Sequence, residues 1–134
     1  MKQHKEFFIT NFFEKSKIAL NDSKKAIEND SLLTAHNRIY YAVFYSVISL
    51  GYSKNFITSK HGKLMGWFNK YFVHENKIFD KQLFKIYENA FQNRMESDYS
   101  FTTELDKNEV LSNFNDAVFF IETVEKYLKT LDYD

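Results

Sequence analysis

The chain has 134 residues, and 18 lysine and arginine residues balance 18 aspartate and glutamate residues. This length suits one domain with a sizeable core, so we expect a single domain over residues 1–134. The absence of cysteine excludes disulfides, cysteine-type zinc sites and thiol nucleophiles. A net charge of zero argues against a protein that coats nucleic acid by bulk charge.

Neither a targeting signal nor a membrane segment stands out. The N-terminal residues lack a sustained apolar stretch and a small-residue cleavage site. The longest strongly apolar run, from Ile39 to Leu50, is too short to span a bilayer. The sequence therefore predicts a soluble, cytoplasmic protein without a membrane partner.

The first two predicted helices follow from helical apolar spacing in a chain with no proline and three glycines. The first covers roughly Lys5 to Glu28, and its inner stripe becomes small after the first turns, which allows a neighbour to approach closely. That stripe consists of Ile9, Phe12, Ser16, Ala19, Ser23 and Ala26. Asp30 or Ser31 is predicted to cap the second helix, which runs to about Leu50.

The second helix is expected to be the central one, because it is apolar on most sides from Ile39 to Leu50. Gly51 is predicted at the C′ position, where a left-handed residue is wanted. Thr58 or Ser59 is then predicted to cap a third helix that ends at about Val73.

The last two predicted helices complete an all-α, up-and-down bundle of about five helices. Asp80 caps the fourth, residues 97–105 form a connection, and Asp106 with Glu109 makes a capping-box-like start for the fifth. The stripe of the fourth helix is Leu83, Tyr87, Ala90 and Arg94. The fifth carries a heptad seam of Val110, Phe114, Ala117, Ile121, Val124, Leu128 and Leu131. The seam packs either inside the bundle or against a second subunit.

The zero net charge conceals an uneven distribution. Residues 52–85 contain seven lysines against two acidic residues, a net of +5, whereas residues 86–134 contain four basic and eleven acidic residues, a net of −7. The basic segment also carries Trp67 and Tyr71, residue types that stack on bases. It is interpreted either as a surface that faces RNA or as a solvated helix face.

Only two of the 18 basic residues are arginines, Arg38 and Arg94, which makes each a candidate for a site that needs a planar, permanently charged fork. Arg94 continues the apolar stripe of the fourth helix, so its guanidinium is partly desolvated and needs an acceptor. Asp98 is within reach if the helix continues, and Tyr99 follows it. This group is either a helix-end salt bridge or an arginine fork aimed at a phosphate.

Arg38 shares one helical face with Tyr41 and Tyr45, and Asn37 precedes it. These side chains could bind a polyanion or a base, or satisfy one another in the core. The four histidines lack metal-ligand spacing, so neither a metal site nor a cofactor is predicted. His61, near the start of the third helix, is expected to cap it or to be buried and hydrogen-bonded rather than to act as a general base.

Three motifs resemble those of HEPN-domain proteins. The run from Asn37 to Tyr45, NRIYYAVFY, resembles the R-x-Y-Y-A-x-F helix of that family. Lys60-His61-Gly62 followed by Trp67-Phe68 resembles the K-H…F start of its third helix. The segment RMESDY, from Arg94 to Tyr99, resembles its R-x-x-x-D-Y signature. The resemblance covers roughly residues 5–131.

The resemblance implies an all-α bundle that commonly dimerises and places fourth-helix arginines in a shared cleft. Many relatives are toxins paired with a small nucleotidyltransferase antitoxin, or parts of RNA-targeting defence systems. The active ones are metal-independent ribonucleases with an R-x4-6-H motif. In that motif the histidine is the acid and base for attack by the RNA 2′-hydroxyl, and the arginine stabilises the phosphorane charge.

This sequence departs from the ribonuclease motif, because no histidine follows His74. The positions that match the family are Arg38, Tyr41, His61, Arg94, Asp98 and Tyr99. The first hypothesis is therefore a homodimeric module that binds nucleotide or RNA phosphate. Its ligand-binding residues are Arg38, Tyr41, Arg94 and Asp98.

Two other hypotheses remain open. The chain could be a ribonuclease toxin in which Arg94 is catalytic and His61 or Tyr99 replaces the missing histidine. It could instead be a non-catalytic interaction subunit for a nucleotidyltransferase partner, in which case the Arg94–Asp98 pair is purely structural.

Overall fold

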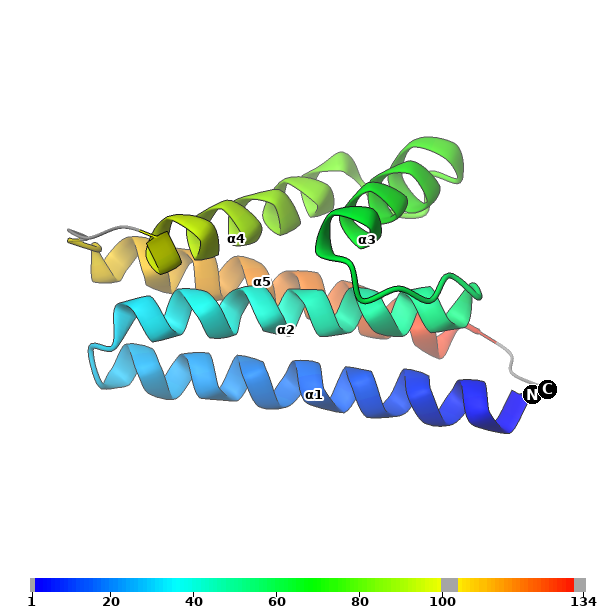
Figure 1. Cartoon of the computed structure of the whole chain (residues 1–134), viewed down its shortest axis with the longest axis horizontal. Coiled ribbons are helices and arrows are strands. Elements are labelled where there is room, and N and C mark those ends of the chain that lie inside the picture. Colours follow the sequence, from blue (N-terminus) through cyan, green and yellow to red (C-terminus); the bar gives the residue numbers. More distant parts are fainter. Residues whose placement is uncertain (1, 100–103, 132–134) are drawn as a thin grey trace.

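The computed structural model describes residues 2–99 and 104–131 of the chain (Figure 1). Within these residues the chain is helical and has no strand, so the predicted all-α fold of about five helices is confirmed. The elements are α1 (Lys2–Glu28), α2 (Leu32–Ser53), α3 (His61–Phe68), the π-helical segment η1 (Asn69–Glu75), α4 (Lys81–Tyr99) and α5 (Lys107–Lys129). Among the described residues, no helix combines the length and the apolar character that crossing a bilayer requires.

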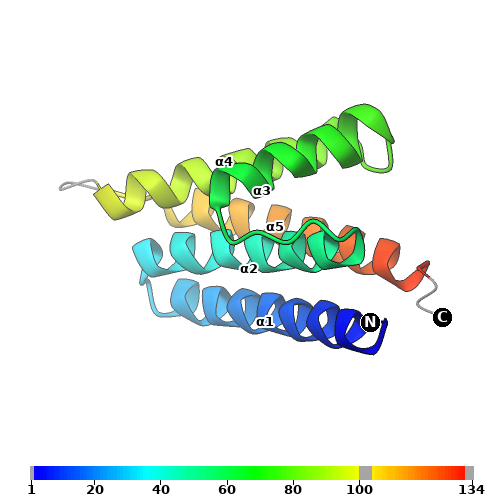
Figure 2. The same cartoon turned by 45° about the vertical axis from the view of Figure 1, so that its right-hand side comes forward.

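Helix α2 is the centre of the bundle. It packs against α1, α3, α4 and α5, and Figures 1 and 2 show α1 antiparallel beside it, with α3 and α4 on the opposite side from α1. The predicted central position of this helix is thus confirmed. Neighbouring helices cover two sides of α2. The side of α2 between α1 and α3 faces the viewer in Figure 1.

Small residues let α1 and α2 approach closely, as the sequence predicted. Ser16 and Ala19 of the inner stripe are buried, and the Ser16 hydroxyl donates to the Ala42 carbonyl of α2 at 2.6 Å. Ser49 of α2 donates in the other direction, to the carbonyl of Ile9 at 2.8 Å. Each serine therefore fills a position too narrow for a large side chain and satisfies its own hydroxyl on the neighbouring helix.

The end of α2 differs from the prediction. Gly51 does not adopt a left-handed conformation; it lies inside the helix, and the left-handed residue after the helix is Asn55 at φ 62°. Glycine is needed at position 51 for another reason. A Cβ there would lie 2.4 Å from the backbone oxygen of Phe56, because the chain folds back so that the Phe56 N–H donates to the Gly51 carbonyl at 2.8 Å.

The predicted side-chain caps form at two helices and not at the other two; Ser31 occupies the N-cap position of α2, but its side chain makes no capping hydrogen bond. Asp80 accepts from the Gln82 N–H at 2.9 Å, and Asp106 accepts from the Asn108 N–H at 3.1 Å. In contrast, α3 begins at His61 without a side-chain cap, because the Thr58 hydroxyl accepts from the N–H of Lys60 instead. Helix α4 also extends to Tyr99, into the segment predicted as a connection.

The core beside α2 is aromatic. Phe68, Phe72, Tyr87 and Phe120 are fully buried, and the Phe68 ring lies 5.5–5.7 Å from the ring centres of the other three. The seam of α5 packs inside the chain, which settles the alternative that the sequence left open. Its buried members are Val110, Ala117, Ile121, Val124 and Leu128.

Candidate functional site

One stripe of α2 stays partly exposed although the helix is central. From Ile39 to Ser53 every residue is buried except Tyr41, Tyr45 and Tyr52. Their spacings of four and seven place these three tyrosines on one helical face, together with the half-buried Arg38 that precedes them. We call this face the open stripe of α2.

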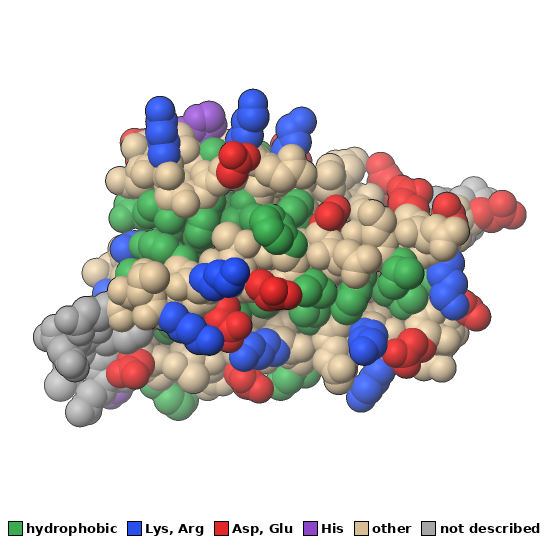
Figure 3. Space-filling view, turned by 180° about the vertical axis from the view of Figure 1, so that it is seen from behind, with side chains coloured by type: hydrophobic (Ala, Val, Ile, Leu, Met, Phe, Trp, Pro, Cys, Tyr) green, Lys and Arg blue, Asp and Glu red, His purple; other side chains and the backbone are tan. Residues whose placement is uncertain are grey.

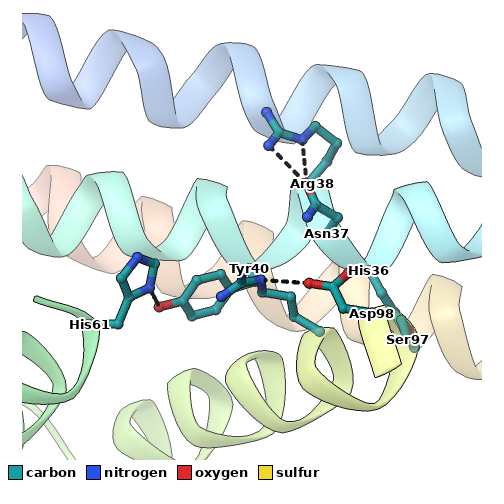
Figure 4. Close-up of polar contacts among 8 residues, drawn as sticks. His36, Asn37, Arg38, Tyr40, His61, Ser97 and Asp98 are labelled. Atoms are coloured by element: carbon teal, nitrogen blue, oxygen red, sulfur yellow. Dashed lines mark hydrogen bonds and ion pairs between the residues drawn. The ribbon is translucent and has the colours of Figure 1, made fainter. Parts of the chain in front are cut away.

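Arg38 stands at the beginning of the open stripe. Its Cζ atom lies 5.1 Å from the centre of the Tyr41 ring, which is cation–π distance. Its Nε and Nη2 atoms donate to the Asn37 side-chain oxygen at 3.0 and 2.8 Å (Figure 4). A neutral amide orients the guanidinium but leaves its charge uncompensated.

Arg94 reaches the same stripe from α4. Its Cζ atom lies 5.3 Å from the ring centres of both Tyr40 and Tyr41, and its side chain is 20% exposed. The Nε atom donates to the Asp98 carboxylate at 3.1 Å. The predicted i,i+4 pair forms because α4 continues through these residues. Tyr41 therefore brings together the only two arginines of the chain.

His61 lies at the edge of this arrangement, on the first turn of α3. Its ring stacks on Phe44, with the ring centres 4.2 Å apart, and its Nδ1 atom is 2.5 Å from the Tyr40 hydroxyl (Figure 4). Burial raises the pKa of the Tyr40 phenol, although Arg94 partly opposes this. The phenol keeps its proton, so it donates to Nδ1 in one tautomer of the neutral imidazole and accepts from an Nδ1–H in the other.

The charge state of His61 follows from the same surroundings. Burial lowers the pKa of His61, and the nearby positive charge of Arg94 lowers it further. The ring is therefore neutral at pH 7. Its Nε2 atom has no hydrogen-bond partner among the described residues, and in the tautomer whose Nδ1 accepts from Tyr40 it offers an N–H donor.

His36 lies only two residues before Arg38 but points into the bundle. It is buried, its Nε2 accepts from the Asn113 amide at 3.3 Å, and its Nδ1–H donates to the Ser97 hydroxyl at 3.0 Å. Burial lowers its pKa, while Glu109 and Glu96 oppose that shift. His36 thus joins α2 to α4 and α5 and takes no part in the arginine site.

The aromatic rings of the basic segment around α3 stack on one another. The Trp67 ring stacks on Phe56 at 4.8 Å and on Tyr71 at 5.7 Å. Figure 3 shows the rear of the molecule, where positively charged side chains lie along one edge and acidic and basic side chains are interspersed below them. The basic segment contains no arginine.

Five of the sequence-predicted residues come together at one place. They are Arg38, Tyr41, His61, Arg94 and Asp98. The side chain of Tyr99 lies outside the described part of the structure. Sequence reasoning missed Tyr40, which orients His61 and underlies Arg94; its place inside the R-x-Y-Y motif was the available signal. The described residues hold no group of three potential metal ligands.

The comparisons with known proteins agree with this fold. The sequence model described as "HEPN domain" matches residues 9–127. The chain belongs to the HEPN domain family. It is 34% identical to a UPF0332 protein of Thermotoga maritima over 127 residues, which cover 95% of this chain and 96% of that protein.

Two proteins of Methanocaldococcus jannaschii, each named as a candidate toxin, are also similar to this HEPN domain. Each is 30% identical to it; the matches cover 86% of this chain and 78% of the first protein, and 84% of this chain and 82% of the second. The three segments that resemble the family motifs each contribute to the site, through Arg38, His61 and Arg94.

Proposed function

We propose that this HEPN domain binds the phosphate of a nucleotide or of RNA between Arg38 and Arg94. The observation that carries the proposal is the position of both guanidiniums against the Tyr41 ring, at 5.1 and 5.3 Å from its centre. Two like charges on one ring repel each other, and a bound anion would relieve that repulsion. Guanidiniums match phosphate because their planar donors can contact two of its oxygens.

The donors needed for a phosphate remain available at the site. Asp98 accepts from the Nε atom of Arg94, which leaves the Nη atoms of that fork free of contacts with the described residues. Arg38 makes hydrogen bonds only to the neutral Asn37 oxygen among them. In the tautomer whose Nδ1 accepts from Tyr40, the Nε2–H of His61 adds a neutral donor beside Arg94. In this proposal Asp98 orients Arg94 rather than neutralising the site.

Binding of a labelled mononucleotide and of a short RNA tests the proposal. We expect Arg94→Ala and Arg38→Ala each to weaken binding about tenfold or more, since hydrogen bonds to charged groups contribute about 1.5–3 kcal/mol. The melting temperature should change little. Lys126→Ala is the matched control, because it removes one exposed positive charge from α5. Unfolding of Arg94→Ala without any binding in the wild type would instead favour the purely structural pair.

A ribonuclease activity is the second candidate, and the position of His61 beside Arg94 favours it. In this reaction His61 would take the proton of the 2′-hydroxyl while Arg94 stabilises the phosphorane. However, Nδ1 is engaged by Tyr40, and in the tautomer that accepts from Tyr40 the Nε2 atom carries a hydrogen and cannot act as a base. We therefore favour binding over cleavage.

Incubation of single-stranded RNA with the purified protein in EDTA separates the two functions. We expect intact RNA. Cleavage that His61→Ala and Arg94→Ala abolish would establish the ribonuclease, and Tyr99→Phe would show whether Tyr99 replaces the missing histidine.

We also propose that the protein works as a homodimer in a toxin–antitoxin or defence pair with a nucleotidyltransferase. The toxin names of the two Methanocaldococcus jannaschii relatives support this context. Sedimentation equilibrium tests the dimer. Co-purification with the product of a neighbouring nucleotidyltransferase gene tests the partner, and a monomer that captures no such protein would remove this part of the proposal.

A further inference from the structure

A row of aromatic rings leads away from Tyr41 along the seam between α1 and α2. The ring centres are 5.8 Å apart from Tyr41 to Tyr45, 6.3 Å from Tyr45 to Phe12, 5.6 Å from Phe12 to Tyr52 and 5.0 Å from Tyr52 to Phe8. We call these five residues the aromatic ladder. Its three tyrosines are the open stripe of α2, and its two phenylalanines come from α1.

The ladder is accompanied by positive charge. Lys15 places its Nζ atom 5.0 Å from the centre of the Phe12 ring and 5.9 Å from that of Tyr45. Lys60 lines a groove of about 410 Å³ beside Phe12 and Tyr52. Arg38 and Arg94 close the other end at Tyr41.

Acidic side chains are scarce along this path. The described residues that line the groove include none. Among the described residues no carboxylate lies within ion-pair distance of Lys15, Arg38 or Lys60, and Asp98 is the partner of Arg94. The ladder thus combines rings with three cations, Lys15, Arg38 and Lys60, that have no carboxylate within ion-pair distance among the described residues.

We propose that the aromatic ladder holds the bases of single-stranded RNA whose phosphate occupies the arginine pair; this inference rests on the proposed function. A ligand for the ladder needs planar groups that pack against the rings and negative charges that contact the cations, both at regular intervals. The bases and phosphates of single-stranded RNA meet these needs. A duplex presents its bases already stacked and paired, so it cannot use the rings. Tyr41 and Tyr52 are about 16 Å apart along α2 at 1.5 Å per residue, a length that suits about four nucleotides.

Affinity as a function of RNA length tests the ladder separately from the arginine pair. Fluorescence anisotropy would compare a mononucleotide with RNAs of two, four and eight nucleotides. We expect affinity to rise about tenfold or more up to four nucleotides and then to level off, because each stacked base adds binding energy.

The variants locate the source of that gain. The double variant Tyr45→Leu/Tyr52→Leu should lose the gain for the four-nucleotide RNA and keep the affinity for the mononucleotide. Tyr45→Phe/Tyr52→Phe keeps the rings and should keep the gain, which controls for the fold. Tyr71→Leu, on η1 in the basic segment, is the matched aromatic control and should behave as the wild type. Lys15→Ala should reduce the salt dependence by about one phosphate contact.

The opposing outcomes are distinct. Mononucleotide binding without any gain with length would overturn the ladder and leave the proposed function intact. No binding of either ligand would remove the proposed function itself. If Tyr71→Leu loses the gain in affinity with RNA length, the RNA binds at the basic segment instead. A double variant that changes the oligomeric state or partner capture, but not RNA binding, would show that a protein covers the ladder.

Discussion

Tyr40 and Tyr41 are neighbours in sequence but lie on different sides of α2. Tyr40 is fully buried, and its hydroxyl is hydrogen-bonded to Nδ1 of His61. Tyr41 remains half-exposed and contacts both arginines. Consecutive helix residues point about 100° apart. A single step along the chain therefore crosses from the buried side of α2, which we call its closed side, to its open stripe.

The two sides differ in how their polar groups are satisfied. On the closed side, Ser49 and His36 have hydrogen-bond partners on neighbouring helices. On the open stripe, Arg38 has only a neutral oxygen as its partner among the described residues. Substitutions on the closed side should therefore change stability, and those on the open stripe should change binding.

The largest expected difference is in stability. Leu50→Ala, at a fully buried position of α2, should lower the free energy of unfolding by about 2–5 kcal/mol because it leaves a cavity. Leu33→Ala makes the same change in the same helix where the side chain is 46% exposed, and it should have an effect within about 0.5 kcal/mol. Urea unfolding measures both, and equal effects would show that burial does not decide how much a substitution in α2 changes stability.

A smaller effect concerns the pH dependence of stability through His36. Because burial lowers its pKa below 6.5, the unfolded chain binds the proton at a higher pH than the folded chain. The contribution to stability is complete above the unfolded pKa and is lost as the pH falls below 6.5. His61 contributes with the same sign.

We expect the melting temperature to fall less between pH 7.5 and pH 5.5 in His36→Gln than in the wild type. His74→Gln, at an exposed histidine, is the control and should follow the wild type. If the melting temperature of His36→Gln falls as much as that of the wild type, the buried His36 is not a source of the pH dependence.

The smallest effect concerns Asp98 of α4, which binds Arg94 beside the open stripe. Asp98→Asn keeps an oxygen that can accept from Arg94, and an exposed i,i+4 ion pair contributes only about 0.3–0.5 kcal/mol. Stability should therefore hardly change in urea unfolding, while loss of the negative charge should tighten mononucleotide binding about twofold. Asp98→Ala also removes the acceptor and should weaken binding. Weaker binding by Asp98→Asn would show that the charge itself is required.

Much of the fold was predictable because it depends on interactions between residues close in sequence. Asp80 and Asp106 bond to the backbone two residues on, and the stripe of α1 and the seam of α5 follow helical periodicity. The role of Gly51 was not predictable, because it depends on where Phe56 returns against α2. The π-helical turn of η1 had no recognised signal either.

The candidate site divides in the same way. The sequence by itself determined the helical class and the family motifs and singled out five residues that lie together at the candidate site, since spacing and residue type are local properties. Only the tertiary structure decided that Arg38 and Arg94, which are 56 positions apart in the chain, meet at the ring of Tyr41. That meeting depends on the packing of α4 against α2, which buried side chains from several helices set together and no local pattern encodes.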